Sequence, residues 1–194
     1  MSKLVIVTGA SRGLGLAICR QLLQARYSVL ALARTQSDEL TQLQQQGLLF
    51  HTADLSKLDN IPALCSELTK QYGRPYALIN NAAVGYDGVL ATMHNTEINS
   101  LLNLNIQAPI LLSKYLLRPM LLNQSGRIVN ISSIIARTGF NGLSVYAASK
   151  AALEGFTKSL AREVGKAGIT VNCVAPGYMQ TEMTQSLQGD KLES

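Results

Sequence analysis

A chain of 194 residues with 47% hydrophobic content can bury one sizeable core but not two, so we expect a single domain over residues 1–194. Its net charge of +5 comes from 17 basic and 12 acidic residues that are scattered. With no basic stripe and no recognisable motif, this distribution argues against nucleic-acid binding and favours a solvated surface, or an anionic small ligand or acidic partner.

No apolar stretch approaches the roughly 18 to 20 residues of a membrane span, and the opening MSKLVIVTG is strand-like, which leaves no room for a signal peptide. We therefore expect a cytoplasmic protein without membrane contact. Cys19, Cys65 and Cys173 lie far apart without metal-ligand spacing, so the sequence predicts reduced, buried thiols and no metal site.

Short apolar runs alternate with helical periodicity along the chain. The expected strands are 4–8, 28–33, 48–53, 76–80, 127–132 and 169–175. These runs are continuously apolar, as strands are when helices cover both faces of a parallel sheet. The repeated βαβ order predicts an α/β, doubly wound parallel sheet of the Rossmann type, which ends here after its sixth strand.

The first expected strand leads directly into the glycine-rich turn TGASRGLG (8–15) and then into a helical segment. This order is typical of a dinucleotide site, because a pyrophosphate docks on the helix N-terminus and glycines allow its close approach. The spacing G-x-x-x-G-x-G is not the commoner G-x-G-x-x-G, and close packing is the alternative use of these glycines. We favour the dinucleotide interpretation.

The end of the second strand bears on the choice of dinucleotide. Sites for NAD place Asp or Glu there, whereas this strand ends in Arg34 with no acid before Asp38. Arg34, joined by Arg12, matches the geometry of a ribose 2′-phosphate, which favours NADP(H). The alternative is that both arginines are simply exposed.

Two further segments bring polar groups to the same edge of the sheet. Ser132 and Ser133 follow the fifth strand at its carboxyl end, where open α/β sheets bind ligands. Tyr146 and Lys150 are four residues apart in the next helical segment and therefore share one helix face. A hydroxyl, a phenol and an ammonium group are thus expected beside the cofactor crevice.

These motifs together resemble the short-chain dehydrogenase/reductase family from residue 3 to about residue 184. The matching motifs are TGASRGLG (8–15), ADL (53–55), NNAA (80–83), Asn105 in NLNIQ, the ISS serines, YAASK (146–150) and APG (175–177). The resemblance implies a catalytic set of Asn105, Ser133, Tyr146 and Lys150. Tyr146 would be the general acid in reduction, with its pKa lowered by the Lys150 ammonium group, which would also hold the nicotinamide ribose. Ser133 would orient the substrate carbonyl, and Ser132 should point to the opposite side of the strand.

Asn105 lies in a helical run in which Pro109 follows four residues later. Proline has no N–H group, so the Asn105 carbonyl receives no helical hydrogen bond from it. The resemblance implies that this carbonyl holds a water molecule leading to Lys150. The alternative is a simple helix kink at Pro109.

The resemblance also implies a set of cofactor-binding residues, with Asp54 accepting from the adenine amino group, Asn81 to Ala83 lining the ribose, and the backbone after Gly177 facing the carboxamide. Ala83 stands where the family usually has glycine. The full set is Gly9, Ser11, Arg12, Gly13, Leu14, Gly15, Arg34, Asp54, Leu55, Asn81, Ala82, Ala83, Tyr146, Lys150, Pro176, Gly177, Met179 and Thr181.

Within the family, VGYDGVLATM (84–93), SLAREV (159–164) and VAPGYMQTEMT (174–184) resemble the β-ketoacyl-acyl-carrier-protein reductases of fatty-acid synthesis. This implies NADPH-dependent reduction of a 3-oxoacyl group, with the acidic acyl carrier protein as a partner. However, two positions at which that subgroup often presents arginine to the carrier fall on Gln124 and Ala167.

Two alternatives therefore stay open. One is a reductase or dehydrogenase of small ketones, sugars, steroids or quinones, and the other is a protein that binds NADP(H) without catalysis. Family members continue with helices over the substrate pocket and a seventh strand that helps build the tetramer, and none of that sequence is present here. We expect a homodimer or homotetramer if the protein is full length.

Overall fold

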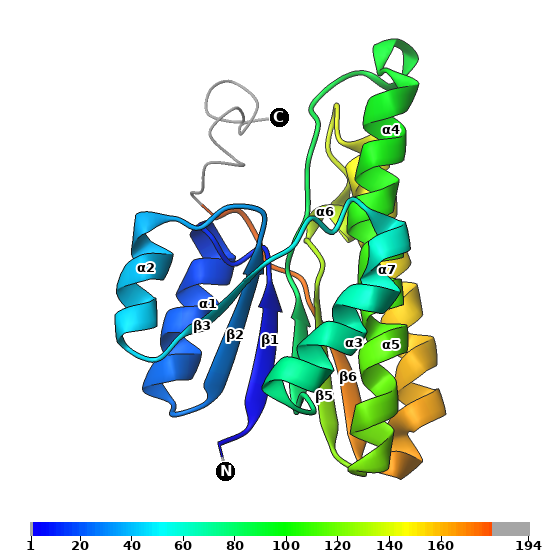
Figure 1. The fold of residues 1–194 in the computed structure, drawn as a ribbon. Helices are drawn as coiled ribbons and strands as arrows, with labels where there is room; N and C mark the ends of the chain where they lie inside the picture. Colours follow the sequence, from blue (N-terminus) through cyan, green and yellow to red (C-terminus); the bar gives the residue numbers. More distant parts are fainter. Residues whose placement is uncertain (1, 180–194) are drawn as a thin grey trace.

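The computed structural model describes residues 2–179. Six parallel strands form one sheet in the order β3-β2-β1-β4-β5-β6 (Figure 1). The strands are β1 Leu4–Thr8, β2 Ser28–Ala33, β3 Leu49–Thr52, β4 Ala77–Asn80, β5 Gly126–Ile131 and β6 Ile169–Val174. All six expected strands are confirmed, with ends that differ by at most one residue. The doubly wound fold class is confirmed as well.

The helices alternate with these strands along the chain. They are α1 Gly13–Gln24, α2 Asp38–Gln45, α3 Ile61–Tyr72, α4 Asn95–Leu102, α5 Ala108–Leu122, α6 Ile135–Thr138 and α7 Ser144–Val164. A π-helical segment, η3 Asn103–Gln107, joins α4 to α5, and the 3₁₀ segments are η1 Leu58–Asn60, η2 Leu90–Thr92 and η4 Gly165–Ala167. None of the helices within residues 2–179 is long and apolar enough to cross a membrane.

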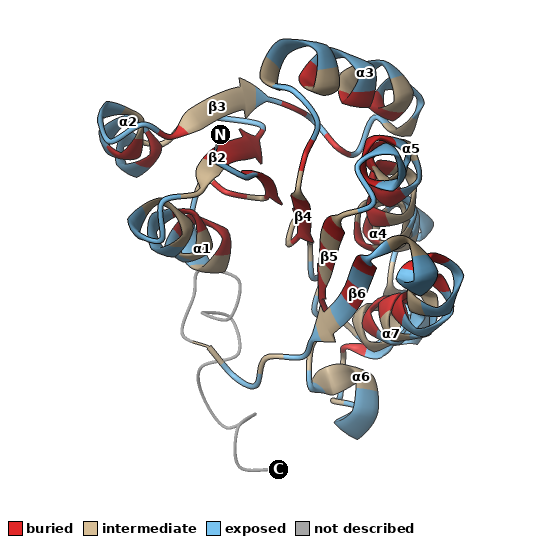
Figure 2. Cartoon of the chain, turned by 90° about the horizontal axis from the view of Figure 1, so that it is seen from below, coloured by how far each residue is buried: buried red, intermediate tan, exposed pale blue. Residues whose placement is uncertain are grey.

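Helices cover both faces of the sheet, with α1 and α2 on one side and α3, α5 and α7 on the other (Figure 2). Successive residues of a strand point to opposite faces, and β1 divides its side chains accordingly. Leu4 and Ile6 join the core beneath α3, α5 and α7, whereas Val5 and Val7 join the core beneath α1 and α2. Both faces of β1 are therefore buried, which explains its uninterrupted apolar sequence.

The direction in which the chain winds reverses at the centre of the sheet, because β1 lies between β2 and β4. The loops that leave β1 and β4 consequently run to opposite faces and leave a crevice at the carboxyl ends of these strands. Helix α7 borders the same end. Its buried residues, Ser149, Lys150, Leu153, Thr157, Leu160 and Val164, recur every three or four positions and form one stripe against the sheet.

Two of the three cysteines are buried as expected. Burial raises the pKa of the Cys19 and Cys65 thiols to about 12 in each case, which keeps both protonated at neutral pH. Cys173, in β6, is only half-buried, so the expectation of a buried thiol is wrong there. It is an edge-strand residue, and no strand pairs beyond β6 among the described residues.

Candidate active site

The turn between β1 and α1 is shaped by its glycines. Gly9 and Gly13 have φ angles of +64° and +54°, a region that side chains with a Cβ rarely adopt. A Cβ on Gly15 would lie 2.6 Å from the Asn81 Nδ2 atom and would collide with the Gly9 carbonyl group. These glycines are therefore required by the backbone of the turn itself, whatever ligand the turn holds.

Thr8, at the end of β1, ties this turn to the end of β4. Its hydroxyl accepts hydrogen bonds from the backbone N–H groups of Asn81 and Ala82, both at 2.9 Å, and donates to the Ile79 carbonyl at 3.3 Å. The Asn81 amide nitrogen donates to the Thr8 carbonyl at 2.9 Å. Thr8 belongs to the quoted motif, but sequence analysis gave it no role. It fixes the spacing between the two loops that border the crevice.

A cleft of about 410 Å³ occupies the crevice, which is within the size range of small-molecule sites. Every expected cofactor-binding residue that the structure describes lines it; Thr181 lies outside the described residues. It also has lining residues that sequence analysis missed: Leu32, Ala33, Ala53, Ser56, Val84, Tyr86, Ser100, Leu104, Ile131 and Ser132. Most of these lie within two positions of an expected site residue in the sequence, and Ser100 and Leu104 are one helical turn apart on α4 and η3.

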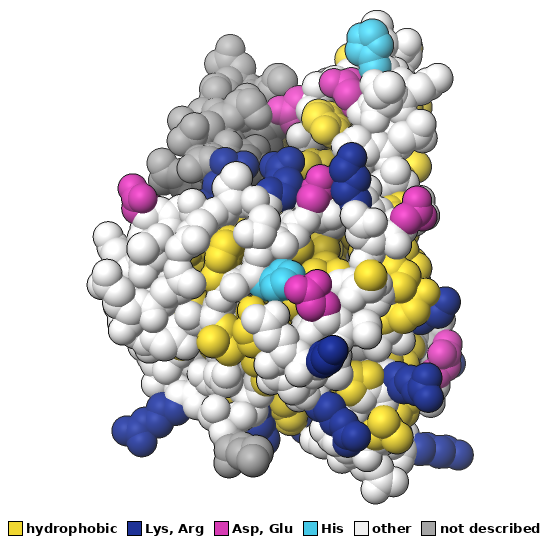
Figure 3. Space-filling model, in the orientation of Figure 1, with side chains coloured by type: hydrophobic (Ala, Val, Ile, Leu, Met, Phe, Trp, Pro, Cys, Tyr) yellow, Lys and Arg dark blue, Asp and Glu magenta, His cyan; other side chains and the backbone are white. Residues whose placement is uncertain are grey.

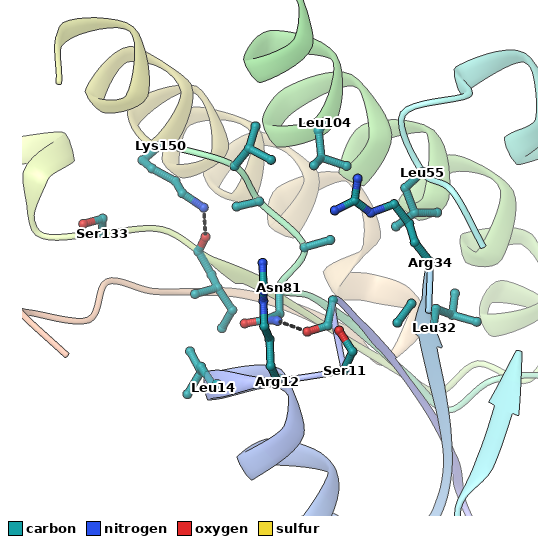
Figure 4. A pocket seen from close by; sticks show the side chains of 18 of the residues that line it. Ser11, Arg12, Leu14, Leu32, Arg34, Leu55, Asn81, Leu104, Ser133 and Lys150 are labelled. Atoms are coloured by element: carbon teal, nitrogen blue, oxygen red, sulfur yellow. Dashed lines mark hydrogen bonds between the residues drawn. The ribbon is translucent and has the colours of Figure 1, made fainter. Parts of the chain in front are cut away.

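Two arginines line the cleft, Arg12 from the glycine turn and Arg34 from the end of β2 (Figure 4). Helix α1 begins beside them, and its N-cap residue Arg12 makes no side-chain cap. The first-turn N–H groups and two guanidinium groups therefore suit an anion such as a pyrophosphate or a 2′-phosphate. On this geometry the described residues fit a phosphorylated dinucleotide.

Asp54 lies across the same end of the cleft. Its Oδ1 atom accepts from the Ser56 hydroxyl at 2.7 Å and from the Ser56 backbone N–H at 3.0 Å. The hydrogen bond from the Ser56 hydroxyl is the main reason why the pKa of Asp54 is lowered, and the nearby positive charges of Lys57 and Arg34 act in the same direction. The carboxylate is thus ionised and held in place as an acceptor.

Ser133, Tyr146 and Lys150 meet at the other end of the cleft, at the carboxyl end of β5. Ser133 and Tyr146 both line this end of the cleft, and the Ser133 hydroxyl accepts from the Ile135 backbone N–H at 3.3 Å. The Lys150 ammonium nitrogen donates to the Ile131 carbonyl at 2.9 Å and lies 5.5 Å from the centre of the Tyr146 ring. The three groups are brought together as the spacing predicted.

The protonation of this cluster differs from the expectation. Burial raises the pKa of the Tyr146 phenol, and the hydrogen bond from Ser133 offsets part of that rise. The expected lowering of this pKa by Lys150 is wrong in this structure, because the ammonium group is directed at the Ile131 carbonyl. Burial also lowers the pKa of Lys150 to about 8.

Ser132 turns away from the phenol, as the strand alternation predicted. The residue is 2% exposed, and its single hydroxyl proton is shared between the Lys150 carbonyl at 3.2 Å and the Glu154 carboxylate at 3.3 Å. Ser133 is therefore the serine that contacts Tyr146.

Asn105 is buried behind the cleft and does not line it. Its amide group pairs with Val84, accepting from the backbone N–H at 2.9 Å and donating to the carbonyl at 2.8 Å, and it also donates to the Ser149 hydroxyl at 3.2 Å. The side chain thus holds the loop after β4 against α7.

The helix around Asn105 is a π-helix rather than the kinked α-helix we considered. The Ala108 N–H donates to the Asn103 carbonyl, five residues back, and Pro109 lies in the first turn of α5, which begins at Ala108. A π-turn inserts an extra residue into the helix and is frequent at functional sites. Within residues 2–179 no group of His, Cys, Asp and Glu side chains could hold a metal ion.

The family model for short chain dehydrogenase matches residues 3–192. The chain belongs to the short-chain dehydrogenase/reductase family. It is therefore an oxidoreductase, and its relatives within this family support ketone reduction as its general chemistry. The expected resemblance to the 3-oxoacyl-acyl-carrier-protein reductases is likewise confirmed.

The 3-oxoacyl-[acyl-carrier-protein] reductase FabG of Vibrio harveyi is 37% identical over 97% of this chain and 78% of its own length. FabG of Escherichia coli is 36% identical over the same shares. Carbonyl reductase family member 4 of Xenopus tropicalis is 39% identical over 99% of this chain and 82% of its own length.

Solved structures of the family superpose closely. A putative NAD(P)-dependent gluconate 5-dehydrogenase from Beutenbergia cavernae with bound NADP has a TM-score of 0.89 and 33% identity, over 97% of this chain and 77% of that one. A metagenomic short-chain oxidoreductase in complex with NADP has a TM-score of 0.84 and 35% identity, over 91% of this chain and 82% of that one.

Proposed function

We propose that the chain is an NADPH-dependent reductase that transfers hydride to the keto group of a 3-oxoacyl chain carried by acyl carrier protein. One observation carries the proposal: Ser133, Tyr146 and Lys150 line the same cleft as Arg12 and Arg34. A proton donor and an anion site at opposite ends of one cleft suit a reduction by a phosphorylated dinucleotide.

The cofactor in this proposal is NADP(H), which supplies the hydride when bound. Arg12 and Arg34 would hold its 2′-phosphate, the first turn of α1 its pyrophosphate, and Asp54 its adenine amino group. Support comes from the absence of an acid at the end of β2, where NAD sites have one, and from the two NADP-bound structures described above.

Tyr146 would donate its proton to the carbonyl oxygen of the substrate while Ser133 donates a hydrogen bond to the same oxygen. The raised pKa of Tyr146 suits this role, because it keeps the phenol protonated and able to donate at neutral pH. The Lys150 ammonium group, 5.5 Å from the ring centre, would stabilise the phenolate that remains. Asn105 would hold the Val84 loop and, through its carbonyl, a water molecule on the path to Lys150.

The 3-oxoacyl substrate is supported by the resemblance to the two FabG relatives and by the positive net charge, which suits the acidic carrier. The second candidate is a small ketone, sugar, steroid or quinone. Gln124 and Ala167 favour it, since neither offers a charge to a carrier protein, and so does the likeness to a carbonyl reductase.

Lys and Arg side chains gather at the lower edge of the face in Figure 3, where the strands begin. There Lys3 and Arg127 lie over the ring of Tyr76, at 4.3 and 5.5 Å from its centre. This basic edge would attract an acidic carrier electrostatically, and it lies at the end of the strands opposite the cleft.

A homodimer or homotetramer is also part of the proposal, and light scattering of the purified chain tests it.

NADPH oxidation by the wild-type chain should be compared with acetoacetyl-acyl carrier protein, acetoacetyl-CoA and a panel of small ketones and sugars. We expect the highest kcat/KM with the carrier-bound substrate, and a larger loss for Arg127→Glu with that substrate than with the CoA ester. A kcat/KM that is higher for a small ketone would support the second candidate instead. A chain that binds NADPH but oxidises it with none of these substrates would support a binding protein without catalysis.

A further inference from the structure

A carboxylate on α7 contacts residues on both sides of Ser133 in the chain. Glu154, on α7, accepts from the Arg137 Nε atom of α6 at 3.2 Å. Its other oxygen accepts from the Ser132 hydroxyl at 3.3 Å. The Glu154 side chain is 11% exposed, so its charge lies mostly inside the protein, whereas the Arg137 side chain is 71% exposed.

These contacts fix the chain immediately before and after Ser133. Ser132 is tied to α7 through Glu154 and through the Lys150 carbonyl. After Ser133, the Ile135 N–H that donates to the Ser133 hydroxyl belongs to α6, and α6 is tied to α7 through Arg137. Both flanks of Ser133 are therefore held by one side chain, on the helix that carries Tyr146 and Lys150.

We propose that Glu154, with Arg137, is a positioning residue that fixes the Ser133 hydroxyl against the Tyr146 phenol. Its effect on turnover rests on the proposed function, whereas its effect on the Ser133–Tyr146 contact does not. An exposed ion pair by itself stabilises little. Here, however, the carboxylate also accepts from a buried hydroxyl, and an error of about 1 Å in the placement of a reacting group can cost about a hundredfold in rate.

The protonation state of the Tyr146 phenol reports its contact with the Ser133 hydroxyl. A hydrogen bond from Ser133 stabilises the phenolate, so loss of that bond must raise the pKa of Tyr146. The experiment labels the seven tyrosines with ¹³C at the ring carbon that bears the hydroxyl, assigns Tyr146 from Tyr146→Phe, and follows its signal with pH. The variants are Glu154→Gln, Glu154→Leu, Arg137→Gln and Ser133→Ala.

We expect the titration midpoint of Tyr146 to rise in Ser133→Ala and in Glu154→Leu. Glu154→Gln and Arg137→Gln should give smaller rises, because the side chain at position 154 still offers an oxygen to Ser132 in both, whereas leucine does not. Glu163→Gln, an exposed carboxylate near the end of the same helix, is the matched control and should leave the midpoint unchanged. A Tyr146 midpoint in Glu154→Leu equal to that of the wild type would overturn the inference, whatever happens to stability.

Turnover supplies the second readout. We expect Glu154→Leu to lower kcat about tenfold, consistent with a displaced hydroxyl, while the Kd for NADPH stays within about twofold of the wild-type value. Equal kcat in both proteins would overturn the inference. If the wild-type chain does not oxidise NADPH at all, the proposed function fails, and the Tyr146 titration still decides the positioning role.

Discussion

Lys150 directs its charge at the backbone of the neighbouring strand: its ammonium nitrogen lies 2.9 Å from the Ile131 carbonyl oxygen at the end of β5. The side chain is 3% exposed, and one carbonyl replaces only part of the hydration that the ammonium group had in water. Burial therefore lowers the pKa of Lys150 to about 8. The positive charge of Lys150, which the proposed chemistry needs, therefore lowers the stability of the folded protein.

The first prediction concerns this cost. Lys150→Met should be inactive but more stable than the wild type near pH 7, by about 2 kcal/mol. The fall in the pKa of Lys150 from 10.5 to about 8 corresponds to about 3 kcal/mol of destabilisation of the wild type. The variant loses the hydrogen bond to Ile131, which lowers its stability by about 1 kcal/mol. Urea denaturation of the two proteins measures the difference, with the exposed Lys158→Met as control. A variant that is less stable than the wild type at pH 7 would rule this account out.

The same pKa sets the pH dependence of stability. Between about pH 8 and 10.5 the unfolded chain binds more protons at Lys150 than the folded chain does, so the wild type gains stability as pH rises. Above about pH 9 the raised pKa values of Cys19 and Cys65 act in the opposite direction. Both proteins contain these thiols, so the difference between them reports Lys150. The stability advantage of Lys150→Met should shrink between about pH 8 and 10.5, and a constant difference over that range would contradict the assignment.

Reduction itself should fall as pH rises past about 8. Tyr146 stays protonated there because its pKa is raised, but Lys150 loses the proton that stabilises the developing phenolate. The measurement is kcat for ketone reduction against pH at saturating NADPH. A profile that stays flat until Tyr146 itself titrates would show that the charge of Lys150 is not needed.

Arg34→Asp should move cofactor preference from NADPH toward NADH. The change removes a cation beside the cleft and places a carboxylate where NAD sites have one. A hydrogen bond to a charged group contributes about 1.5–3 kcal/mol, so we expect kcat/KM for NADPH to fall at least about tenfold. Arg20→Asp, the same change at an exposed position of α1, is the control. If the ratio of kcat/KM for NADPH to that for NADH is unchanged, Arg34 does not bind the 2′-phosphate.

Asn105→Ala should lower stability as well as activity. The substitution leaves the N–H and carbonyl groups of Val84 without the amide that pairs with both. Fully buried unpaired groups cost about 1–3 kcal/mol, and because the Val84 groups are only part-buried we expect a loss of about 1 kcal/mol. The free energy of unfolding in urea measures this loss, and Asn99→Ala on the exposed side of α4 should change it little. If stability is retained while kcat falls, Asn105 acts on chemistry alone and the clamp on Val84 is unimportant.

The fold could be predicted from sequence because each strand is buried on both faces. That burial requires continuous apolar runs such as Leu4–Thr8, which are easily recognised. The meeting of Ser133 with Tyr146 was also predictable, since both follow from the carboxyl edge of β5 and from a four-residue helical spacing. The π-helix at Asn103–Gln107 was not, because Pro109 removes a donor without specifying how the helix accommodates the loss.

Contacts between distant segments were the other part that sequence analysis missed. The bond from Ser132 to Glu154 joins residues 22 positions apart, and that from Arg137 to Glu154 joins residues 17 apart. Neither separation matches a helical or strand periodicity from which a contact could be predicted. The direction of the pKa shift at Tyr146 was predicted wrongly for a related reason: it depends on how deeply the phenol is buried and on where the Lys150 side chain points.

The central claim is that Tyr146 donates the proton in ketone reduction, and one comparison tests it most directly. NADPH oxidation with acetoacetyl-acyl carrier protein should be measured for the wild type and for Tyr146→Phe, with the Kd for NADPH of both proteins. We predict that kcat falls at least about a hundredfold in Tyr146→Phe, the usual contribution of a general acid, while NADPH binding is nearly unchanged. Turnover of Tyr146→Phe at the wild-type rate would contradict the claim.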